Sequence, residues 1–276
     1  MSRVAIQGIK GSFHDLVVQR YFQETSITLK ECLSFDDVFL ALKKKEVDLA
    51  VVAIENTLAG SILPNYTHIQ NNSVFIKGEI YLNIQMNLLA LPKQEMSNLK
   101  YVASHPMALL QCKQFLSDYP YLELVEISDT AEGARKVRDK ELIDTGIIAS
   151  VRAAELYDLN VLHRGIETHK ENYTRFLILS NERGEVHDSN KASICFELKH
   201  EVGSLVDILM IIKCHELNMT KIQSVPVVGR PYNYHFHVDL CWKNYEYFEN
   251  AMAIVQRNVH DLQILGIYKE GDKSGI

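Results

Sequence analysis

Apolar runs alternate with amphipathic segments through the first 180 residues of the chain. The apolar runs at 3–8, 27–33 and 48–56 predict strands, and the segments at 12–24 and 35–46 have the apolar spacing of helices. The run at 48–56 is almost wholly apolar, which is typical of a strand covered on both faces. Strands that alternate with helices predict a mostly parallel sheet with helices on both faces, so this part is expected to be α/β.

The pattern restarts after a long apolar stretch at 76–92. Strands are then predicted at 101–106, 122–128, 145–150, 160–167 and 174–180, with helices at 107–119, 130–141 and 151–158. The chain is therefore expected to form two α/β lobes and to cross between them near residues 80 and 170. A cleft between two such lobes is a common place for a small-molecule site.

The last part of the chain has a different order of elements. A polar segment at 182–190 reads as a linker, and it is followed by strand 191–198, helix 203–217, strands 219–228 and 232–240, helix 245–259 and strand 262–270. This βαββαβ order is ferredoxin-like. The expected domains are therefore two lobes in 1–181, a linker at 182–190 and a small domain in 191–276.

Composition and charge exclude several functions. The net charge is -6 and no basic stripe is present, so nucleic acid is not an expected partner. No apolar run reaches the ~18 residues of a membrane span, and no secretory leader is apparent at the N-terminus. The 5 cysteines form no CxxC pair, which indicates reduced thiols in a cytoplasmic protein. His235 and His237 share a strand face and could hold a metal, but no further ligand is spaced for it, so no metal is expected.

Polar side chains follow several predicted strands at their ends. They are Ser12, then Glu55, Asn56 and Thr57, then Ser104 and Gln111, and finally Thr174 and Arg175. Ligands of open α/β sheets bind beyond such strand ends. Each stretch also has a plain structural interpretation, because a serine can cap a helix and Gln111 can be an exposed helix residue.

Together these side chains offer hydroxyls, amides and one fixed cation. The sequence shows no Cys–His dyad, no serine triad order and no spaced pair of carboxylates for acid and base. Binding and orienting a small anion, with a hydrogen bond from Thr174 to a departing group, is the chemistry this set favours.

Six stretches occur in the order seen in prephenate dehydratases, which the chain resembles over nearly its whole length. They are GSF, IENTLAGS, SHPMALLQC, DTAEGAR, GIIASVRAAELYDLNVL and NYTRFLIL. Residues 203–226 resemble the ACT regulatory domain of those enzymes. The resemblance implies a two-lobed, periplasmic-binding-protein-like catalytic domain with a ferredoxin-like ACT domain. It also implies the decarboxylating dehydration of prephenate to phenylpyruvate, CO2 and water in phenylalanine biosynthesis, with no cofactor.

The resemblance also implies roles for single residues. Thr174 would hydrogen-bond or protonate the departing hydroxyl, Arg175 would pair with a substrate carboxylate, and Phe176 would wall the ring pocket. The remaining substrate contacts would come from Ser12, Asn56, Thr57, Ser104 and Gln111. Glu55 would either tune the site or have a structural role.

A phenylalanine effector is expected at an interface between ACT domains. The implied residues are Gly203, Ser204, Leu205, Val206, Gln223, Ser224, Val225 and Pro226. These segments depart from the family, which has GAL and ESRP where this chain has GSL and QSVP, so a domain that serves dimerisation alone is the alternative. A homodimer or homotetramer through ACT domains is expected.

Two other functions stay open on the sequence. An arogenate dehydratase would bind an amino group where prephenate has a keto group, and a two-lobed amino-acid-sensing protein would bind without catalysis. Because the sequence begins at the dehydratase lobe, with no helical chorismate mutase segment before it, no mutase activity is expected.

Overall fold

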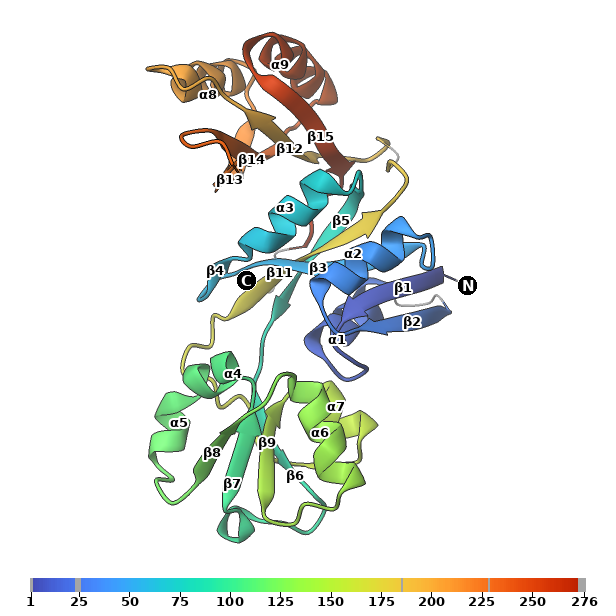
Figure 1. Cartoon of the computed structure of the whole chain (residues 1–276), viewed down its shortest axis with the longest axis vertical. Helices are drawn as coiled ribbons and strands as arrows, with labels where there is room; N and C mark the ends of the chain where they lie inside the picture. Colours follow the sequence, from blue (N-terminus) through green and yellow to red (C-terminus); the bar gives the residue numbers. More distant parts are fainter. Residues whose placement is uncertain (1, 23–25, 185, 228, 273–276) are drawn as a thin grey trace.

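Three sheets are stacked along the long axis of the computed structural model, which describes residues 2–22, 26–184, 186–227 and 229–272 (Figure 1). A six-stranded sheet lies in the middle, a five-stranded sheet lies at one end and a four-stranded sheet lies at the other. We call them the first lobe, the second lobe and the C-terminal domain. Positions 23–24 of the predicted helix at 12–24, position 185 of the predicted linker, and positions 228 and 273–276 of the predicted small domain fall outside the described residues.

The first lobe has the strand order β2-β1-β3-β11-β5, and β4 also pairs with β3. Its elements are β1 (Ser2–Gln7), α1 (Phe13–Tyr21), β2 (Ile27–Cys32), α2 (Phe35–Lys43), β3 (Leu49–Asn56), β4 (Gly60–Ser61), α3 (Leu63–Asn71), β5 (Phe75–Asn83) and β11 (Tyr173–Ser180). Strands β1, β2 and β3 are parallel as predicted. Strand β11 is antiparallel to both its neighbours because the chain returns to this sheet from the far lobe.

The second lobe has the order β10-β6-β9-β7-β8. Its elements are β6 (Asn87–Ala90), a 3₁₀ turn (Met96–Asn98), β7 (Tyr101–Ser104), α4 (Pro106–Gln111), α5 (Lys113–Ser117), β8 (Glu123–Glu126), α6 (Thr130–Asp139), β9 (Thr145–Ala149), α7 (Val151–Leu156) and β10 (Asn160–His163). The helix predicted at 107–119 is divided at Cys112 into α4 and α5. Between the lobes the chain runs from Asn83 to Asn87 and back from His163 to Tyr173.

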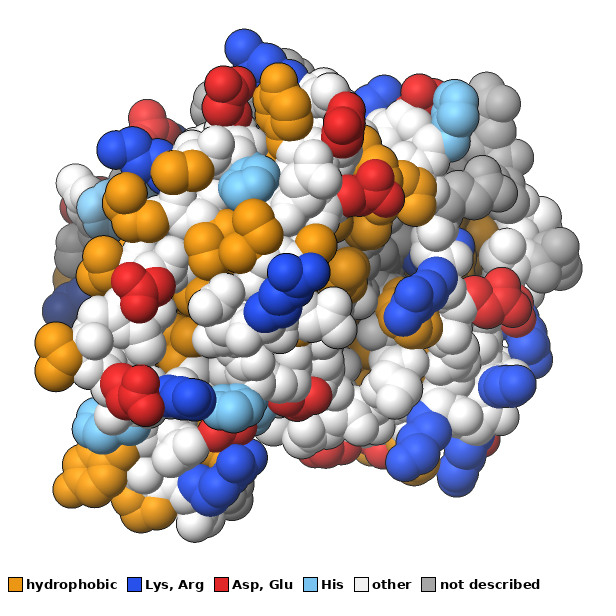
Figure 2. Space-filling model, turned by 90° about the horizontal axis from the view of Figure 1, so that it is seen from above, with side chains coloured by type: hydrophobic (Ala, Val, Ile, Leu, Met, Phe, Trp, Pro, Cys, Tyr) orange, Lys and Arg blue, Asp and Glu red, His pale blue; other side chains and the backbone are white. Residues whose placement is uncertain are grey.

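The C-terminal domain has the strand order β13-β14-β12-β15 with α8 and α9 on one face, which confirms the ferredoxin-like prediction (Figure 1). Its elements are β12 (Lys191–Glu197), α8 (Ser204–Cys214), β13 (Asn218–Pro226), β14 (Tyr234–Cys241), α9 (Tyr245–Asn258) and β15 (His260–Tyr268). Figure 2 views this end of the molecule and shows hydrophobic side chains interspersed with charged ones of both signs.

The other face of this sheet packs on the first lobe. Cys195, Val225 and Leu265 belong to the same buried cluster as the apolar side chains of β3 and α2. His237 of β14 is also buried there, with its ring 5.0 Å from that of Tyr66 of α3. The first lobe is therefore covered by the C-terminal domain on one face of its sheet.

The five cysteines are free thiols. Among the described residues, no helix combines the length and apolar character needed to cross a bilayer.

Candidate active site

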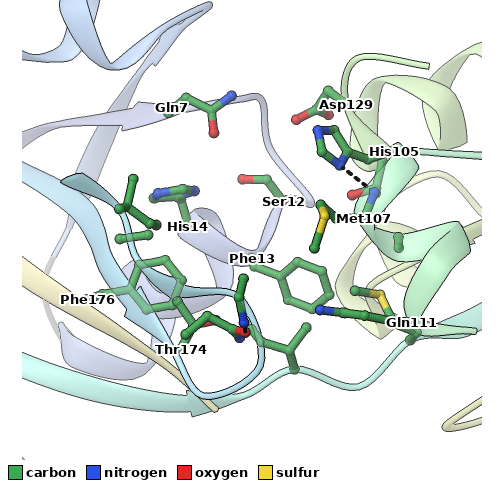
Figure 3. A pocket seen from close by; sticks show the side chains of 18 of the residues that line it. Gln7, Ser12, Phe13, His14, His105, Met107, Gln111, Asp129, Thr174 and Phe176 are labelled. Atoms are coloured by element: carbon green, nitrogen blue, oxygen red, sulfur yellow. Dashed lines mark hydrogen bonds between the residues drawn. The ribbon is translucent and has the colours of Figure 1, made fainter. Parts of the chain in front are cut away.

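A cavity of about 320 Å³ lies between the two lobes, and we call it the interlobe cavity (Figure 3). This volume is at the lower end of the range for small-molecule sites. The first lobe contributes Gln7, Ser12, Phe13, His14, Phe35, Ala53, Asn56, Ala59, Ile62, Thr174 and Phe176, and Ile84 lies in the segment that crosses to the second lobe. The second lobe and the crossing segment contribute Met86, His105, Met107, Ala108, Gln111, Ser128, Asp129 and Thr130.

A glycine-containing loop after β1 joins the two lobes beside the cavity. The Ser150 hydroxyl of the second lobe donates to the Gly11 carbonyl at 2.6 Å, and the Tyr157 hydroxyl donates to the Lys10 carbonyl at 2.7 Å. Gly11 has a φ of +88°, and a Cβ there would lie 3.2 Å from the Cα of Ala153. Only glycine combines this backbone conformation with so close an approach of the lobes.

Thr174 is held by a chain of side-chain amides that spans both lobes. Asn56 donates from Nδ2 to Thr174 Oγ1 at 2.9 Å and to Asn172 Oδ1 at 2.8 Å. Asn172 in turn donates to Gln111 Oε1 at 3.1 Å. Because Thr174 Oγ1 already accepts a hydrogen bond from Asn56, its own O–H is available to donate to a ligand.

Asn172 was not among the predicted site residues. It is fully buried and connects Asn56 of the first lobe to Gln111 of the second. The available signal was its position two residues before Thr174, where the polar stretch enters β11.

His14 is a second residue that the sequence reasoning missed. Its ring lies edge-on to Phe176 at 5.0 Å and to Phe35 at 5.7 Å, and its Nε2 has no hydrogen-bond partner among the described residues. Burial lowers the pKa of His14 to about 4, so the ring is neutral near pH 7. It therefore presents an uncharged polar atom in an apolar wall.

The N-termini of α1 and α6 both reach the interlobe cavity. Ser12 caps α1, and Asp129 caps α6 by accepting from Glu132 N at 2.7 Å. Burial raises the pKa of the Asp129 carboxyl. No Lys or Arg is among the described residues that line the cavity, so helix N-termini, hydroxyls and amides are the groups available to an anion.

The position of Arg175 contradicts its predicted place beside a substrate, and the ion pairs of Glu55 fit the structural role that was one of its two predicted alternatives. Successive strand residues point to opposite faces, so Thr174 and Phe176 face the cavity while Arg175 faces the C-terminal domain. Its guanidinium contacts Glu79, Asp239 and Glu55, and it is 3% exposed. The expected pairing of Arg175 with a substrate carboxylate is therefore wrong for this arrangement.

Ser104 and Thr57 also lie outside the interlobe cavity. Ser104 is fully buried and donates to the Ile148 carbonyl at 2.8 Å, and the cap of α4 is His105 rather than Ser104. Thr57 donates to the Glu171 carbonyl and accepts from Tyr173 N, both at 3.0 Å. Both hydroxyls therefore form hydrogen bonds with backbone groups and stabilise the local structure.

Five predicted residues do meet in the cavity, namely Ser12, Asn56, Gln111, Thr174 and Phe176. Figure 3 labels Ser12, Gln111, Thr174 and Phe176 there. Figure 3 also shows Asp129 close to His105, which accepts at Nδ1 from Met107 N at 3.2 Å. The cavity thus combines the hydroxyl of Thr174 and those of other lining residues with an amide chain, two helix N-termini and an aromatic wall. Such a site can orient a small anion and hydrogen-bond a leaving group.

The two predicted effector segments lie at one end of the C-terminal sheet. Strands β12 and β13 are each antiparallel to β14 and hence parallel to each other, so 203–206 and 223–226 both lie at the carboxyl ends of these strands. Ser204 also lines a cavity of about 440 Å³ beside the start of α8, together with Lys199, Asp207 and Arg257.

The described residues contain no group of three or more His, Cys, Asp or Glu side chains arranged to hold a metal ion.

Comparison with known proteins identifies a family. The family model described as prephenate dehydratase matches residues 4–184. A bifunctional chorismate mutase/prephenate dehydratase of Enterobacter agglomerans is 31% identical over 272 residues, covering 97% of this chain and 70% of that protein. A chloroplastic arogenate dehydratase/prephenate dehydratase of Arabidopsis thaliana is 33% identical over 281 residues, covering 96% of this chain and 72% of that protein.

Solved structures give the same fold. GqqA, described as a novel type of quorum quenching acylase, superposes with a TM-score of 0.88 at 26% identity over 97% of this chain and 98% of that one. A prephenate dehydratase of Arthrobacter aurescens in complex with L-Phe gives 0.86 at 24% identity, over 97% of this chain and 89% of that one. From the family match over most of the two lobes and from relatives above 30% identity, the chain belongs to the prephenate dehydratase family.

Proposed function

We propose that this chain catalyses the decarboxylating dehydration of prephenate to phenylpyruvate in phenylalanine biosynthesis, as a carbon–oxygen lyase. The observation that carries the proposal is the Thr174 hydroxyl, fixed by Asn56 in a cavity of small-molecule size between the lobes. We assign residues 1–181 to this catalytic function and 191–276 to regulation, with 182–190 as the linker. The free thiols fit a cytoplasmic protein.

The reaction needs little from the protein. The bond between the ring and its carboxylate breaks, CO2 leaves, and the electron pair completes the aromatic ring. The bond from the ring to the 4-hydroxyl breaks at the same time, and the departing oxygen takes up one proton to become water. No electrons are gained or lost overall, so orientation and a hydrogen bond to the leaving oxygen suffice.

We assign a role in this reaction to the groups on each wall of the cavity. The N-terminus of α1, with the hydroxyls and amides that line the cavity, holds the carboxylates of prephenate, and Phe176 packs against its ring. Thr174 donates its O–H to the departing hydroxyl. The bond that Asn56 donates to Oγ1 stabilises the negative charge that builds on this oxygen as the proton moves away.

Replacing Thr174 tests this assignment. In Thr174→Val, kcat should fall by roughly 10²-fold or more while KM for prephenate changes little, because the methyl groups keep the packing and only the donor is lost. Thr174→Ser, which keeps the hydroxyl, is the matched control and should retain most activity. Phenylpyruvate formation, followed by its absorbance in alkali, is the measurement. Equal turnover by Thr174→Val and the unmodified chain would end the assignment.

Arogenate dehydration is a second candidate, because the Asp129 carboxyl lines the cavity. An ammonium group, which arogenate has and prephenate lacks, would be held by that carboxylate and would favour its charged form. Comparison of kcat/KM for the two substrates decides between them.

We also propose L-phenylalanine as the effector, bound at 203–206 and 223–226 where C-terminal domains of two subunits meet. Support comes from the position of both segments at one end of the sheet, and from the L-Phe complex of the structural relative.

A further inference from the structure

A cluster of charged side chains is buried where the first lobe meets the C-terminal domain, and we call it the buried ion cluster. It consists of Glu55, Glu79 and Arg175 from the first lobe and Lys191, Lys221 and Asp239 from the C-terminal domain. Its acids and bases are equal in number. The charges of these side chains therefore cancel within the cluster, and no excess positive charge is left to bind an anion.

Arg175 is the centre of this cluster. Its Nε lies 2.7 Å and its Nη2 2.6 Å from Glu79 Oε2, while its Nη1 lies 2.5 Å from Asp239 Oδ2 and 3.3 Å from Glu55 Oε1. Its Nη2 also donates to the Tyr268 hydroxyl at 3.1 Å. Burial disfavours the charge on Arg175, but Asp239, Tyr268 and Glu79 outweigh it and hold the pKa of Arg175 above its usual value.

Every strand of the C-terminal sheet takes part in the contact. Lys191 of β12 donates to Glu79 at 2.8 and 3.0 Å. Lys221 of β13 contacts Glu55 and donates to Ser61 Oγ at 3.0 Å. Asp239 and Tyr268 supply the contacts from β14 and β15. A shift of this sheet over the first lobe must therefore move Arg175 or separate buried opposite charges, and separating them is costly.

Arg175 and Glu55 are covalent neighbours of the candidate catalytic groups. Arg175 follows Thr174 on β11, and Glu55 precedes Asn56 on β3. These residues form two adjacent pairs in the sheet register, Thr174 with Asn56 and Arg175 with Glu55. The register shifts immediately beyond Arg175, so the strands are irregular at this point. One face of these two pairs thus binds the C-terminal domain while the other forms the Thr174–Asn56 hydrogen bond.

We propose that Arg175 is a positioning residue, which acts through Thr174, and that the buried ion cluster transmits the state of the C-terminal domain to the Thr174–Asn56 pair. This inference rests on the proposed function. It assigns the arginine to the contact between domains and leaves the substrate carboxylates to the groups that line the interlobe cavity. The effector then changes turnover by moving the C-terminal sheet, which contacts β3 and β11 on the face opposite the interlobe cavity.

The first test separates positioning from substrate binding. In Arg175→Lys, kcat for prephenate should fall at least tenfold and KM should stay within twofold, with Arg175→Met showing a larger loss of kcat than the conservative variant. An arginine that binds the substrate carboxylate would give the reverse, a raised KM with kcat little changed. That result would overturn the proposal.

The second test uses Lys221, which lies at the edge of the cluster with its side chain 14% exposed, so its replacement is better tolerated than that of Arg175. In Lys221→Met, kcat without phenylalanine should stay within twofold, and the Kd for phenylalanine from calorimetry should also stay within twofold. The factor by which saturating phenylalanine lowers kcat should be at least five times smaller than in the unmodified chain. Lys243→Met, an exposed lysine of the same domain, is the matched control and should be inhibited like the unmodified chain.

The outcomes of these tests distinguish failure of the proposed function from failure of the coupling through the buried ion cluster. If the unmodified chain turns over neither prephenate nor arogenate, the proposed function fails, and the coupling fails with it. If the unmodified chain is active and Lys221→Met is inhibited as strongly as Lys243→Met, the proposed function stands and the coupling is wrong. Turnover of the unmodified chain that does not respond to phenylalanine would likewise overturn the coupling.

Discussion

His14 makes the stability of this protein depend on pH. Its pKa is about 4 in the folded chain and 6.5 as the ordinary value, because burial disfavours the charged ring. As the pH falls from 6.5 towards 4, the unfolded chain takes up a proton at this position and the folded chain does not. The stabilisation is therefore complete above about pH 6.5 and is lost on acidification, by about 2 kcal/mol at pH 5.

We expect His14→Asn to reduce this loss of folding free energy between pH 7 and pH 5 by about 2 kcal/mol. Urea unfolding at the two pH values measures it. His187→Asn, in which the replaced side chain is 87% exposed, is the control and should leave the pH dependence unchanged. The same pH dependence in both variants would show that His14 is protonated without cost in the folded chain.

Several site residues could be predicted from sequence because strand ends collect polar groups. Thr174 and Asn56 were found this way, and they form a hydrogen bond in the interlobe cavity. Arg175 was misplaced although strand alternation already puts neighbouring residues on opposite faces. The partners that explain its burial, Glu79 and Asp239, are 96 and 64 residues away in the sequence, and nothing local pointed to them.

The loop after β1 sets how the two lobes meet, and Gly11 is its closest contact. Gly11→Ala adds a Cβ 3.2 Å from the Cα of Ala153 in a backbone with a φ of +88°. The hydrogen bonds that Ser150 and Tyr157 donate to this loop would be strained. We expect a loss of about 1–3 kcal/mol in stability and a raised KM, because the N-terminus of α1 moves away from the cavity.

Gly229→Ala is the control for this prediction. Gly229 has a φ of +77°, and nothing lies within 4 Å of the Cβ that it would gain, so it has the backbone cost without the clash. Thermal unfolding and initial rates would be compared for the two variants. A KM raised equally in both would show that the contact between loop and α7 does not position the cavity.

Whether a segment forms a helix or a strand could be predicted better than the direction in which a strand runs in its sheet. The helix predicted at 35–46 is α2, and the capping box of Ser34 with Asp37 starts it. The reversal of β11 could not be predicted from its residues, because it depends on where the chain returns from the second lobe. The break at Cys112 likewise has no glycine or proline to announce it.

Assembly is the remaining property of the whole molecule to be tested. The C-terminal sheet has β13 and β15 at its edges, and strand edges with unpaired backbone groups favour pairing between chains. We expect light scattering at micromolar concentration to give two or four times the chain mass of 31.6 kDa. A mass of one chain over the whole concentration range would contradict this.

Thr220 provides a way to test the β13 edge itself. The register with β14 passes from Met219 to Lys221, so Thr220 lies opposite no β14 residue, at an irregular position of an edge strand, where proline is best tolerated. If chains pair along this edge, Thr220→Pro should lose a backbone donor from the interface and shift the mass towards one chain, while Thr220→Val should behave like the unmodified protein. Because the predicted effector site lies where C-terminal domains meet, the proline variant should also lose inhibition by phenylalanine while keeping its uninhibited turnover. An unchanged mass in Thr220→Pro would place the contact between chains elsewhere, away from β13.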